Sequence, residues 1–240
     1  MTICALGLMA KAPLEGEVKT RLVTPLTARE AAALNICFLR DMAANINSIE
    51  AASGVVVYTP AGSESAFAGI LPERFSFLAQ RGAHLGERLC NATDDLLRQG
   101  FGSVCLINSD SPTLPRSILI RALESLATEG DRVVLGAAED GGYYLIGLKH
   151  AHRNLFNEIA WSTSDVLART RQRAAEIDLP VELLPPWYDV DDAGTLTRLC
   201  EELLFTSPLN GAYPAPHTRA FLEAVVKSEG LQRICPNRAS

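Results

Sequence analysis

The sequence contains no long apolar run. Among its 240 residues, no segment reaches the roughly 18 consecutive apolar residues that a helix needs to cross a bilayer. An apolar run from Ile3 to Ala10 lies near the N-terminus, but no basic residue precedes it, and Lys11, Pro13 and Glu15 follow at once. This pattern predicts a first buried strand rather than a signal peptide or a membrane span.

An excess of basic residues is also missing. Lysine and arginine number 22 against 28 for aspartate and glutamate, which gives a net charge of −6 at pH 7 and a pI near 5.3. Because proteins that bind duplex nucleic acid normally carry a basic excess, this balance argues against nucleic acid as a partner. The hydrophobic share of 48% and the charged share of 21% exclude intrinsic disorder and a low-complexity fibre.

The six cysteines form no Cys-x-x-Cys pair and have no regular spacing. Cys4 and Cys105 lie inside apolar runs, where a buried thiol is expected. The sequence therefore predicts a reduced, cytoplasmic chain without a disulfide framework or a zinc site. The motifs Gly-x-Ser-x-Gly and His-Glu-x-x-His are absent as well, which argues against a hydrolase triad and against zinc catalysis.

Short apolar runs alternate with amphipathic stretches along the chain. Strands are predicted at residues 2–10, 54–58, 75–79, 103–108, 133–137, 143–148 and 181–184. Helices are predicted after a capping box at Thr27 and at 85–98, 115–126, 164–177, 192–205 and 216–228. This alternation indicates an α/β fold with a mostly parallel sheet and helices on both faces. We expect a single domain over 1–240, with a C-terminal helical extension at 208–240.

A cationic loop follows the first predicted strand. It holds Lys11, Lys19 and Arg21 around a single glycine, Gly16. In open α/β sheets ligands bind beyond the carboxyl ends of the strands, and cations with exposed amides suit a phosphate group. We therefore predict a phosphate-binding loop, with a solvated surface loop as the alternative. One glycine is too few for a Walker A loop or a dinucleotide fingerprint.

Acidic residues follow three further predicted strands. Asp110 ends the central strand, where it is placed to hold Mg²⁺ or Mn²⁺ or to close an Asx-type turn. Asp189 and Asp191 alternate, so on an extended segment both would face one way and supply a second contact to the same metal. Asp191 or Asp192 could instead cap the next helix. Asp140 could act on an acceptor hydroxyl or belong to a Gly-Gly hairpin turn.

Other residues near the strand ends are candidates for binding substrate. Gln80 and the backbone of Gly82 could hold a nucleobase and ribose, whereas Arg88 is either a ligand contact or a helix-surface cation. Trp161 could stack on a sugar ring or pack in the interior. Paired glycines allow the backbone to approach a ligand closely. The predicted substrate-binding residues are Ala10, Lys11, Lys19, Arg21, Gln80, Gly82, Arg88, Gly141, Gly142 and Trp161.

Taken together, these motifs resemble a known family. They follow one another as Lys11-Ala-Pro…Gly16-x-Val-Lys19-Thr-Arg21, Leu85-Gly-Glu-Arg88, Asn108-Ser-Asp110-Ser-Pro, Glu139-Asp-Gly-Gly-Tyr-Tyr144, Trp161-Ser-Thr163 and Asp189-Val-Asp191. The set resembles the DUF2064 family of bacterial glycosyltransferase-like proteins, from residue 2 to about residue 205. That family belongs with the GT-A-fold nucleotide-diphospho-sugar transferases. Its relatives include the molybdenum-cofactor guanylyltransferase and the 2-phospho-L-lactate guanylyltransferase.

The resemblance implies a Rossmann-like GT-A fold that binds a nucleotide together with Mg²⁺ or Mn²⁺. By this match the cationic loop anchors phosphate and Asp110 is the metal aspartate, with Asp189 and Asp191 as the second acidic motif. The chain departs from the family pattern at Asn108, because many GT-A glycosyltransferases carry Asp-x-Asp there. Metal binding therefore needs Asp189 or Asp191 from the other strand.

Three functions are open at this point. In the one we favour, the protein transfers a sugar from a nucleotide-diphosphate sugar to a small acceptor. Lys19 and Arg21 then stabilise the diphosphate leaving group, and Asp140 orients or deprotonates the acceptor hydroxyl. In the second, a nucleotidyltransferase releases pyrophosphate from a nucleoside triphosphate. In the third, the protein binds a nucleotide without catalysis.

Overall fold

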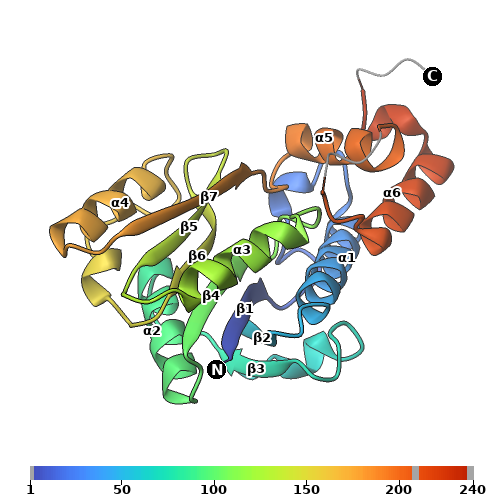
Figure 1. Cartoon of the computed structure of the whole chain (residues 1–240). Coiled ribbons are helices and arrows are strands. Elements are labelled where there is room, and N and C mark those ends of the chain that lie inside the picture. Colours follow the sequence, from blue (N-terminus) through green and yellow to red (C-terminus); the bar gives the residue numbers. More distant parts are fainter. Residues whose placement is uncertain (1–2, 207–210, 237–240) are drawn as a thin grey trace.

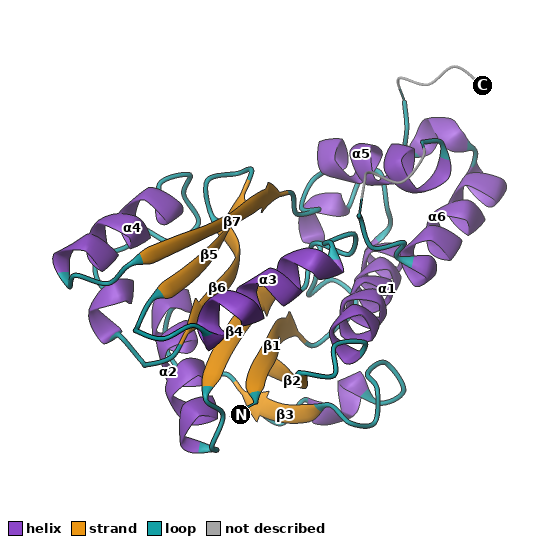
Figure 2. Ribbon diagram, in the orientation of Figure 1, coloured by secondary structure: helices purple, strands orange, loops and turns teal. Residues whose placement is uncertain are grey.

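In the computed structural model, which describes residues 3–206 and 211–236, a seven-stranded sheet runs through the molecule (Figures 1 and 2). The strands are β1 (Cys4–Lys11), β2 (Ala52–Thr59), β3 (Ser76–Ala79), β4 (Ser103–Asn108), β5 (Val133–Ala138), β6 (Tyr143–Leu148) and β7 (Val181–Trp187). Their spatial order is β3-β2-β1-β4-β6-β5-β7. Strand β6 runs antiparallel to β4 and β5, and the other neighbouring pairs are parallel. The predicted α/β fold with a mostly parallel sheet is confirmed.

Helices cover both faces of the sheet. They are α1 (Ala28–Asn47), α2 (Leu85–Arg98), α3 (Arg116–Ala127), α4 (Val166–Glu176), α5 (Ala193–Leu204) and α6 (Pro216–Glu229). Side chains alternate along β2, so that Val56 and Tyr58 join the core with α1 and α3 while Val55 and Val57 join the core with α2 and α4. No helix in the described part of the chain is long and apolar enough to cross a membrane.

A third apolar core lies where α5 and α6 pack on α1 (Figure 1). Its members include Phe38, Leu199 and Leu222, all of which are buried. The buried carboxylate of Asp41 on α1 accepts hydrogen bonds from the first-turn amides of α6, at 3.0 Å from His217 N and 2.8 Å from Thr218 N. A carboxylate at the positive end of a helix is favourable, so α6 is held by both charge and packing. Residues 208–210 and 237–240 of the predicted extension lie outside the described residues.

Most of the element bounds follow the sequence pattern. Helix 85–98 and the strands 103–108 and 143–148 begin and end as predicted. Strand β7 continues past the predicted end at 184, through Pro185 and Pro186 to Trp187. Because β7 is an edge strand, one side of it needs no hydrogen bond and prolines are tolerated there.

The predicted capping box at the start of α1 is present and is joined to the end of the described chain. Thr27 Oγ1 accepts a hydrogen bond from Glu30 N, and the Glu30 carboxylate accepts one from Thr27 N at 2.8 Å. Arg233 Nη1 also donates to Glu30 at 2.9 Å. The Arg233 guanidinium, assisted by the bonds from Thr27 and opposed by partial burial, lowers the pKa of Glu30 from 4.5 to about 2.

We expect the charge of Glu30 to make the stability pH-dependent. Because the folded-state pKa is depressed, the stabilisation is complete above pH 4.5 and is lost as the pH falls through about 2. Glu30→Gln should therefore lower the free energy of unfolding by roughly 2 kcal/mol at pH 7 and by much less at pH 2. Urea unfolding at the two pH values measures the difference.

The matched control is Glu223→Gln, which removes an exposed pair with Arg219 on α6. This change should alter the free energy of unfolding by no more than about 0.5 kcal/mol at either pH. An equal loss from Glu30→Gln at both pH values would show that the ionised carboxylate is not the source of the stabilisation.

Candidate functional site

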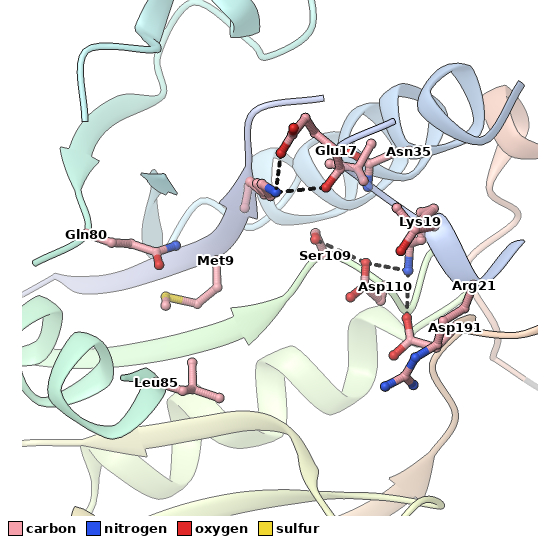
Figure 3. A pocket seen from close by; sticks show the side chains of 14 residues that line it. Met9, Glu17, Lys19, Arg21, Asn35, Gln80, Leu85, Ser109, Asp110 and Asp191 are labelled. Atoms are coloured by element: carbon pink, nitrogen blue, oxygen red, sulfur yellow. Dashed lines mark hydrogen bonds and ion pairs between the residues drawn. The ribbon is translucent and has the colours of Figure 1, made fainter. Parts of the chain in front are cut away.

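A cleft of about 340 Å³ opens where β1 and β4 end (Figure 3). Strand β1 has β2 on one side and β4 on the other, so the winding of the chain reverses between β1 and β4. In open α/β sheets such a switch point is the usual place for a ligand. The cleft is lined by residues 9–11, 17–21, Asn35, Gln80, Leu85, 109–110 and Asp191.

Lys19 joins the two predicted acidic motifs across this cleft. Its Nζ lies 2.7 Å from Asp110 Oδ1 and 2.9 Å from Asp191 Oδ1, and it donates to the carbonyl of Val190 at 2.7 Å. The side chain is 5% exposed, and all three of its donors are used. Burial opposes the charge of Lys19, but the two carboxylates outweigh burial and raise its pKa. Lys19 is therefore a charged link between segments that are 172 residues apart.

Two more carboxylates stand close to this link. Asp140 and Asp189 line a second hollow of about 160 Å³ that shares Leu85 with the first. Burial, together with the negative charges of Asp191, Asp140 and Asp110, raises the pKa of Asp189 to about 6. The carboxylates around Lys19 therefore outnumber its single positive charge.

The helix cap at the second acidic motif is Asp192. Its side chain accepts a hydrogen bond from Thr195 N at 2.8 Å, which completes a capping box at the start of α5. Asp191 is therefore not needed as the cap. Strand β7 ends at Trp187, so strand alternation does not extend to residues 189–191, and Asp189 and Asp191 line different hollows.

A divalent cation fits the donor set of the cleft. Oδ2 of Asp110 and Oδ2 of Asp191 accept no hydrogen bond from any residue that the structure describes. Carboxylate oxygens are the ligands that Mg²⁺ and Mn²⁺ prefer, and a cation would offset the local negative charge. With Lys19 between them, the ligand atoms of Asp110, Asp189 and Asp191 do not all lie within 4.8 Å of one another. Metal binding by these residues stays a prediction.

Lys11 and Arg21, the other two cations of the predicted phosphate loop, differ in whether another side chain already pairs with them. Lys11 is 47% exposed, and its Nζ bonds to the carboxylate of Glu17 at 2.8 Å and to the Glu17 carbonyl at 2.9 Å. Arg21 lines the cleft and forms no hydrogen bond or ion pair with any residue in the described ranges. Because exposed ion pairs contribute little, Lys11 can exchange Glu17 for a ligand at low cost, and Arg21 is free to bind one.

The match to a protein family decides where this chain belongs. Residues 42–163, about half of the chain, match the profile of a family described as "Uncharacterized protein conserved in bacteria (DUF2064)". The chain belongs to the DUF2064 family. Asp110 and Asp140 lie inside the matched range, whereas Lys19, Asp189 and Asp191 lie outside it. No curated protein matches the sequence of this DUF2064 member.

Solved structures resemble this DUF2064 protein over nearly its whole length. One from Desulfovibrio desulfuricans G20, described as a "putative nucleotide-diphospho-sugar transferase", is 30% identical in sequence and has a TM-score of 0.80. The comparison covers 93% of this chain and 98% of the other.

Two more distant structures share the fold alone. A CMP:2-keto-3-deoxy-manno-octonic acid synthetase complexed with CTP is 9% identical, with a TM-score of 0.55 over 82% of this chain and 97% of the other. A cytidylyltransferase from Leptospira borgpetersenii serovar Hardjo-bovis is 12% identical, with a TM-score of 0.55 over 100% of this chain and 99% of the other.

Four of the residues predicted to bind substrate lie in different places in the DUF2064 chain. Gln80 and Ala10 line the cleft, and Gln80 is fixed by a hydrogen bond from its Nε2 to the Val57 carbonyl at 2.7 Å. Gly82 does not line the cleft. Its φ of 135° and its close approach to α2 require glycine, and its carbonyl accepts a bond from Arg88 Nε at 3.2 Å. Arg88 lines a separate hollow together with Lys11.

The hairpin between β5 and β6 forms one wall of the second hollow. Gly141 has a φ of 93°, and a Cβ on it would stand 2.1 Å from the Ser164 carbonyl oxygen, so only glycine fits. Gly142 donates its amide to Asp140 Oδ1 at 2.9 Å, as in the turn alternative considered for the sequence. Trp161 lines the hollow and packs edge to face on Tyr143. Trp161 is therefore packed, as in one of the two alternatives that the sequence left open. Stacking of Trp161 on a sugar ring stays a prediction.

Asn35 lines the cleft of this DUF2064 protein and was missed by motif reasoning. It comes from α1 rather than from a strand end, it is 5% exposed, and its Oδ1 is buried without a hydrogen-bond partner in the described residues. A buried amide without a partner is costly unless a ligand completes it. The sequence held one signal for Asn35, which is a polar residue on the otherwise apolar face of the predicted helix.

Proposed function

We propose that the protein is a metal-dependent transferase that moves a sugar from a nucleotide-diphosphate sugar to a small acceptor. The observation that carries this proposal is the contact of Lys19 with Asp110 and Asp191, which joins two acidic motifs at the switch point of an α/β sheet. The 30% identical structure from Desulfovibrio desulfuricans, described as a transferase of this class, supports it.

The chain's own residues bind the donor in this proposal. Arg21 and Lys11 bind the diphosphate, and Lys19 keeps the carboxylates of Asp110 and Asp191 facing the cleft. These two aspartates, with Asp189, would hold Mg²⁺ or Mn²⁺. When bound, the cation neutralises the charge that develops on the leaving diphosphate.

The second hollow receives the acceptor. Asp140 Oδ1 is engaged by Gly142 N, which orients the carboxylate and leaves Oδ2 for the acceptor hydroxyl. The hydroxyl oxygen bonds to the anomeric carbon of the sugar, its proton passes to Asp140, and the bond from that carbon to the diphosphate oxygen breaks. The nucleoside diphosphate then leaves with the bonding electrons.

A nucleotidyltransferase is the second candidate, and the cationic loop after β1 favours it. Lys11 and Arg21 border the cleft and suit the triphosphate of a nucleoside triphosphate that releases pyrophosphate. Two features weaken this candidate. Lys19 is committed to carboxylates, and the resemblance to nucleotidyl-transferring proteins is one of fold alone.

Thermal shifts against nucleoside triphosphates, nucleoside diphosphates and nucleotide-diphosphate sugars, each with and without Mg²⁺ or Mn²⁺, test the proposal. A ligand at a hundred times its dissociation constant stabilises the fold by about 2.7 kcal/mol, which is readily measured. We expect one nucleotide sugar to stabilise the protein more than its triphosphate does, and only with the metal. Greater stabilisation by a triphosphate supports the second candidate, and binding without turnover of any donor supports a non-catalytic binding protein.

Asn35 provides a sharper test of the cleft. Asn35→Leu removes a buried Oδ1 that has no hydrogen-bond partner among the described residues, so the free energy of unfolding should stay the same or rise by up to about 1 kcal/mol. The same change should weaken the best ligand of the panel by about tenfold, because one buried hydrogen bond to it is lost. Urea unfolding and calorimetric titration measure the two effects.

Asn45 on the same helix is the matched control. It is also buried with an unpartnered Oδ1, but its Nδ2 donates to the Leu114 carbonyl at 2.8 Å and it does not line the cleft. Asn45→Leu should therefore destabilise the fold and leave ligand affinity unchanged. Unchanged ligand affinity in Asn35→Leu together with weakened affinity in Asn45→Leu would show that Asn35 does not contact the ligand.

A further inference from the structure

A second group of possible metal ligands lies at the edge of the sheet opposite the cleft. Asp131 precedes β5, and His150 and His152 follow β6. Strands β5 and β6 are antiparallel and Val133 pairs with Leu148, so the start of one strand adjoins the end of the other. Strand β5 runs in the same direction as β4, which places this group away from the carboxyl ends that form the cleft.

The two imidazoles direct a nitrogen at the same oxygen atom. His152 Nε2 lies 2.7 Å from Asp131 Oδ2, and His150 Nδ1 lies 3.2 Å from it. The three ligand atoms all lie within 4.8 Å of one another. The rings are 6.0 Å apart and inclined at 75°, so they approach the oxygen from two directions rather than stack on each other.

The loops that carry these side chains are held in place by other contacts. Asp131 Oδ1 accepts a hydrogen bond from Arg132 N at 2.9 Å, which leaves Oδ2 for the imidazoles. Lys149 Nζ donates to the carbonyls of Thr128 and, at 2.6 Å, of Gly130. The segment after β6 is therefore tied to the loop before β5 by contacts that do not involve either imidazole.

We propose that Asp131, His150 and His152 bind a zinc ion, with water completing a tetrahedral set. Two imidazole nitrogens and a carboxylate oxygen are a donor set that zinc accepts, whereas Mg²⁺ prefers oxygen alone. Each neutral ring binds the ion through the lone pair of the nitrogen that faces Asp131. The proton that this nitrogen donates to Asp131 in the free protein moves, by exchange with water, to the other nitrogen of the ring. The ion links the loop before β5 to the segment after β6 and stabilises the fold without taking part in the reaction at the cleft.

The sequence expectation of no zinc site was based on cysteine spacing, and this site uses no cysteine. The His-x-His spacing of residues 150 and 152 is its only local signal. Asp131 comes from a different loop, and only the antiparallel pairing of β5 with β6 brings it to the two histidines.

Titration of the untagged protein with ZnCl₂ tests the proposal through the ring protons of its histidines, which number four. A single equivalent should shift the NMR signals of His150 and His152 and leave those of His84 and His217 in place. The melting temperature should rise by roughly 5 °C at a hundredfold excess over the dissociation constant. MgCl₂ should move neither ring signal, and unchanged His150 and His152 signals under zinc would overturn the proposal.

Variants separate this site from the acidic cleft. The double change His150→Gln and His152→Gln should abolish the thermal shift with zinc, whereas His84→Gln, at an exposed histidine beside Glu87, should retain it. Asp110→Asn should also retain it. A zinc shift that survives in the double variant and disappears in Asp110→Asn would place the ion at the cleft and reject the site. None of these measurements depends on transferase activity, so their outcome is independent of the proposed function.

Discussion

Replacing Asp110 with asparagine is expected to abolish the effect of Mg²⁺ on nucleotide binding and to lower sugar transfer by a factor of about a thousand or more. Asparagine keeps an oxygen that can accept the hydrogen bond from Lys19, so the link across the cleft can persist. It removes the negative charge that the cation needs, at a strand end where the two preceding residues, Asn108 and Ser109, are uncharged. Thermal shifts with the best nucleotide, with and without Mg²⁺, measure the first effect, and product formation measures the second.

The matched control is Asp192→Asn, a charge removal at a nearby residue that caps α5. Asparagine is as good a helix cap as aspartate, so both stability and the Mg²⁺ effect should be preserved. An Mg²⁺ effect of wild-type size in Asp110→Asn, or its loss in Asp192→Asn, would contradict the assignment of Asp110 as a metal ligand.

Replacing Lys19 with methionine is expected to lower the free energy of unfolding of the metal-free protein by about 3 kcal/mol. The change leaves Asp110 and Asp191 without their shared cation and the Val190 carbonyl without a donor. Removing a buried cation is more costly than removing an exposed pair, because the side chains of Asp110 and Asp191, 29% and 42% exposed, are only partly hydrated and then repel each other. Urea unfolding in the presence of a chelator measures the loss.

Mg²⁺ should restore part of that stability, because a divalent cation can take over the compensation of the two carboxylates. The increase in the urea midpoint on adding Mg²⁺ is therefore expected to be larger for Lys19→Met than for the wild type. Lys11→Met is the control, since its pair with Glu17 is exposed and should be worth no more than about 0.5 kcal/mol. An unchanged urea midpoint for Lys19→Met would show that the link is not a structural element.

Local patterns predicted much of this fold because each element has its own physical signature. The apolar spacing and flanking residues of 85–98 predicted both ends of α2 correctly, and the Thr27–Glu30 capping box predicted the start of α1. The strand ends then pointed to Asp110 and Asp191, since a parallel sheet brings the carboxyl ends of its strands to one edge. The position of each strand end follows from the order of the elements along the chain alone.

Local sequence patterns did not predict which residues the side chains of the site contact. The sequence indicated a phosphate contact for Lys19, but its ammonium is bound by carboxylates that lie 91 and 172 positions further along the chain. Asn35 belongs to α1, whose sequence pattern is that of an ordinary amphipathic helix packed on a core. Both assignments depend on which elements meet in space, and a single sequence carries no direct record of those contacts.

The hold of Asp41 on α6 affects how the protein can be shortened or tagged. Helix α1 carries Asn35 into the cleft and, one to two turns away, Asp41 into the first turn of α6. A chain cut before Pro216 would expose the apolar side of α1 around Phe38 and remove the two amides that donate to the Asp41 carboxylate. We expect such a truncated protein to aggregate and to hold α1, which carries Asn35, less firmly. Helix α6 therefore stabilises one wall of the cleft.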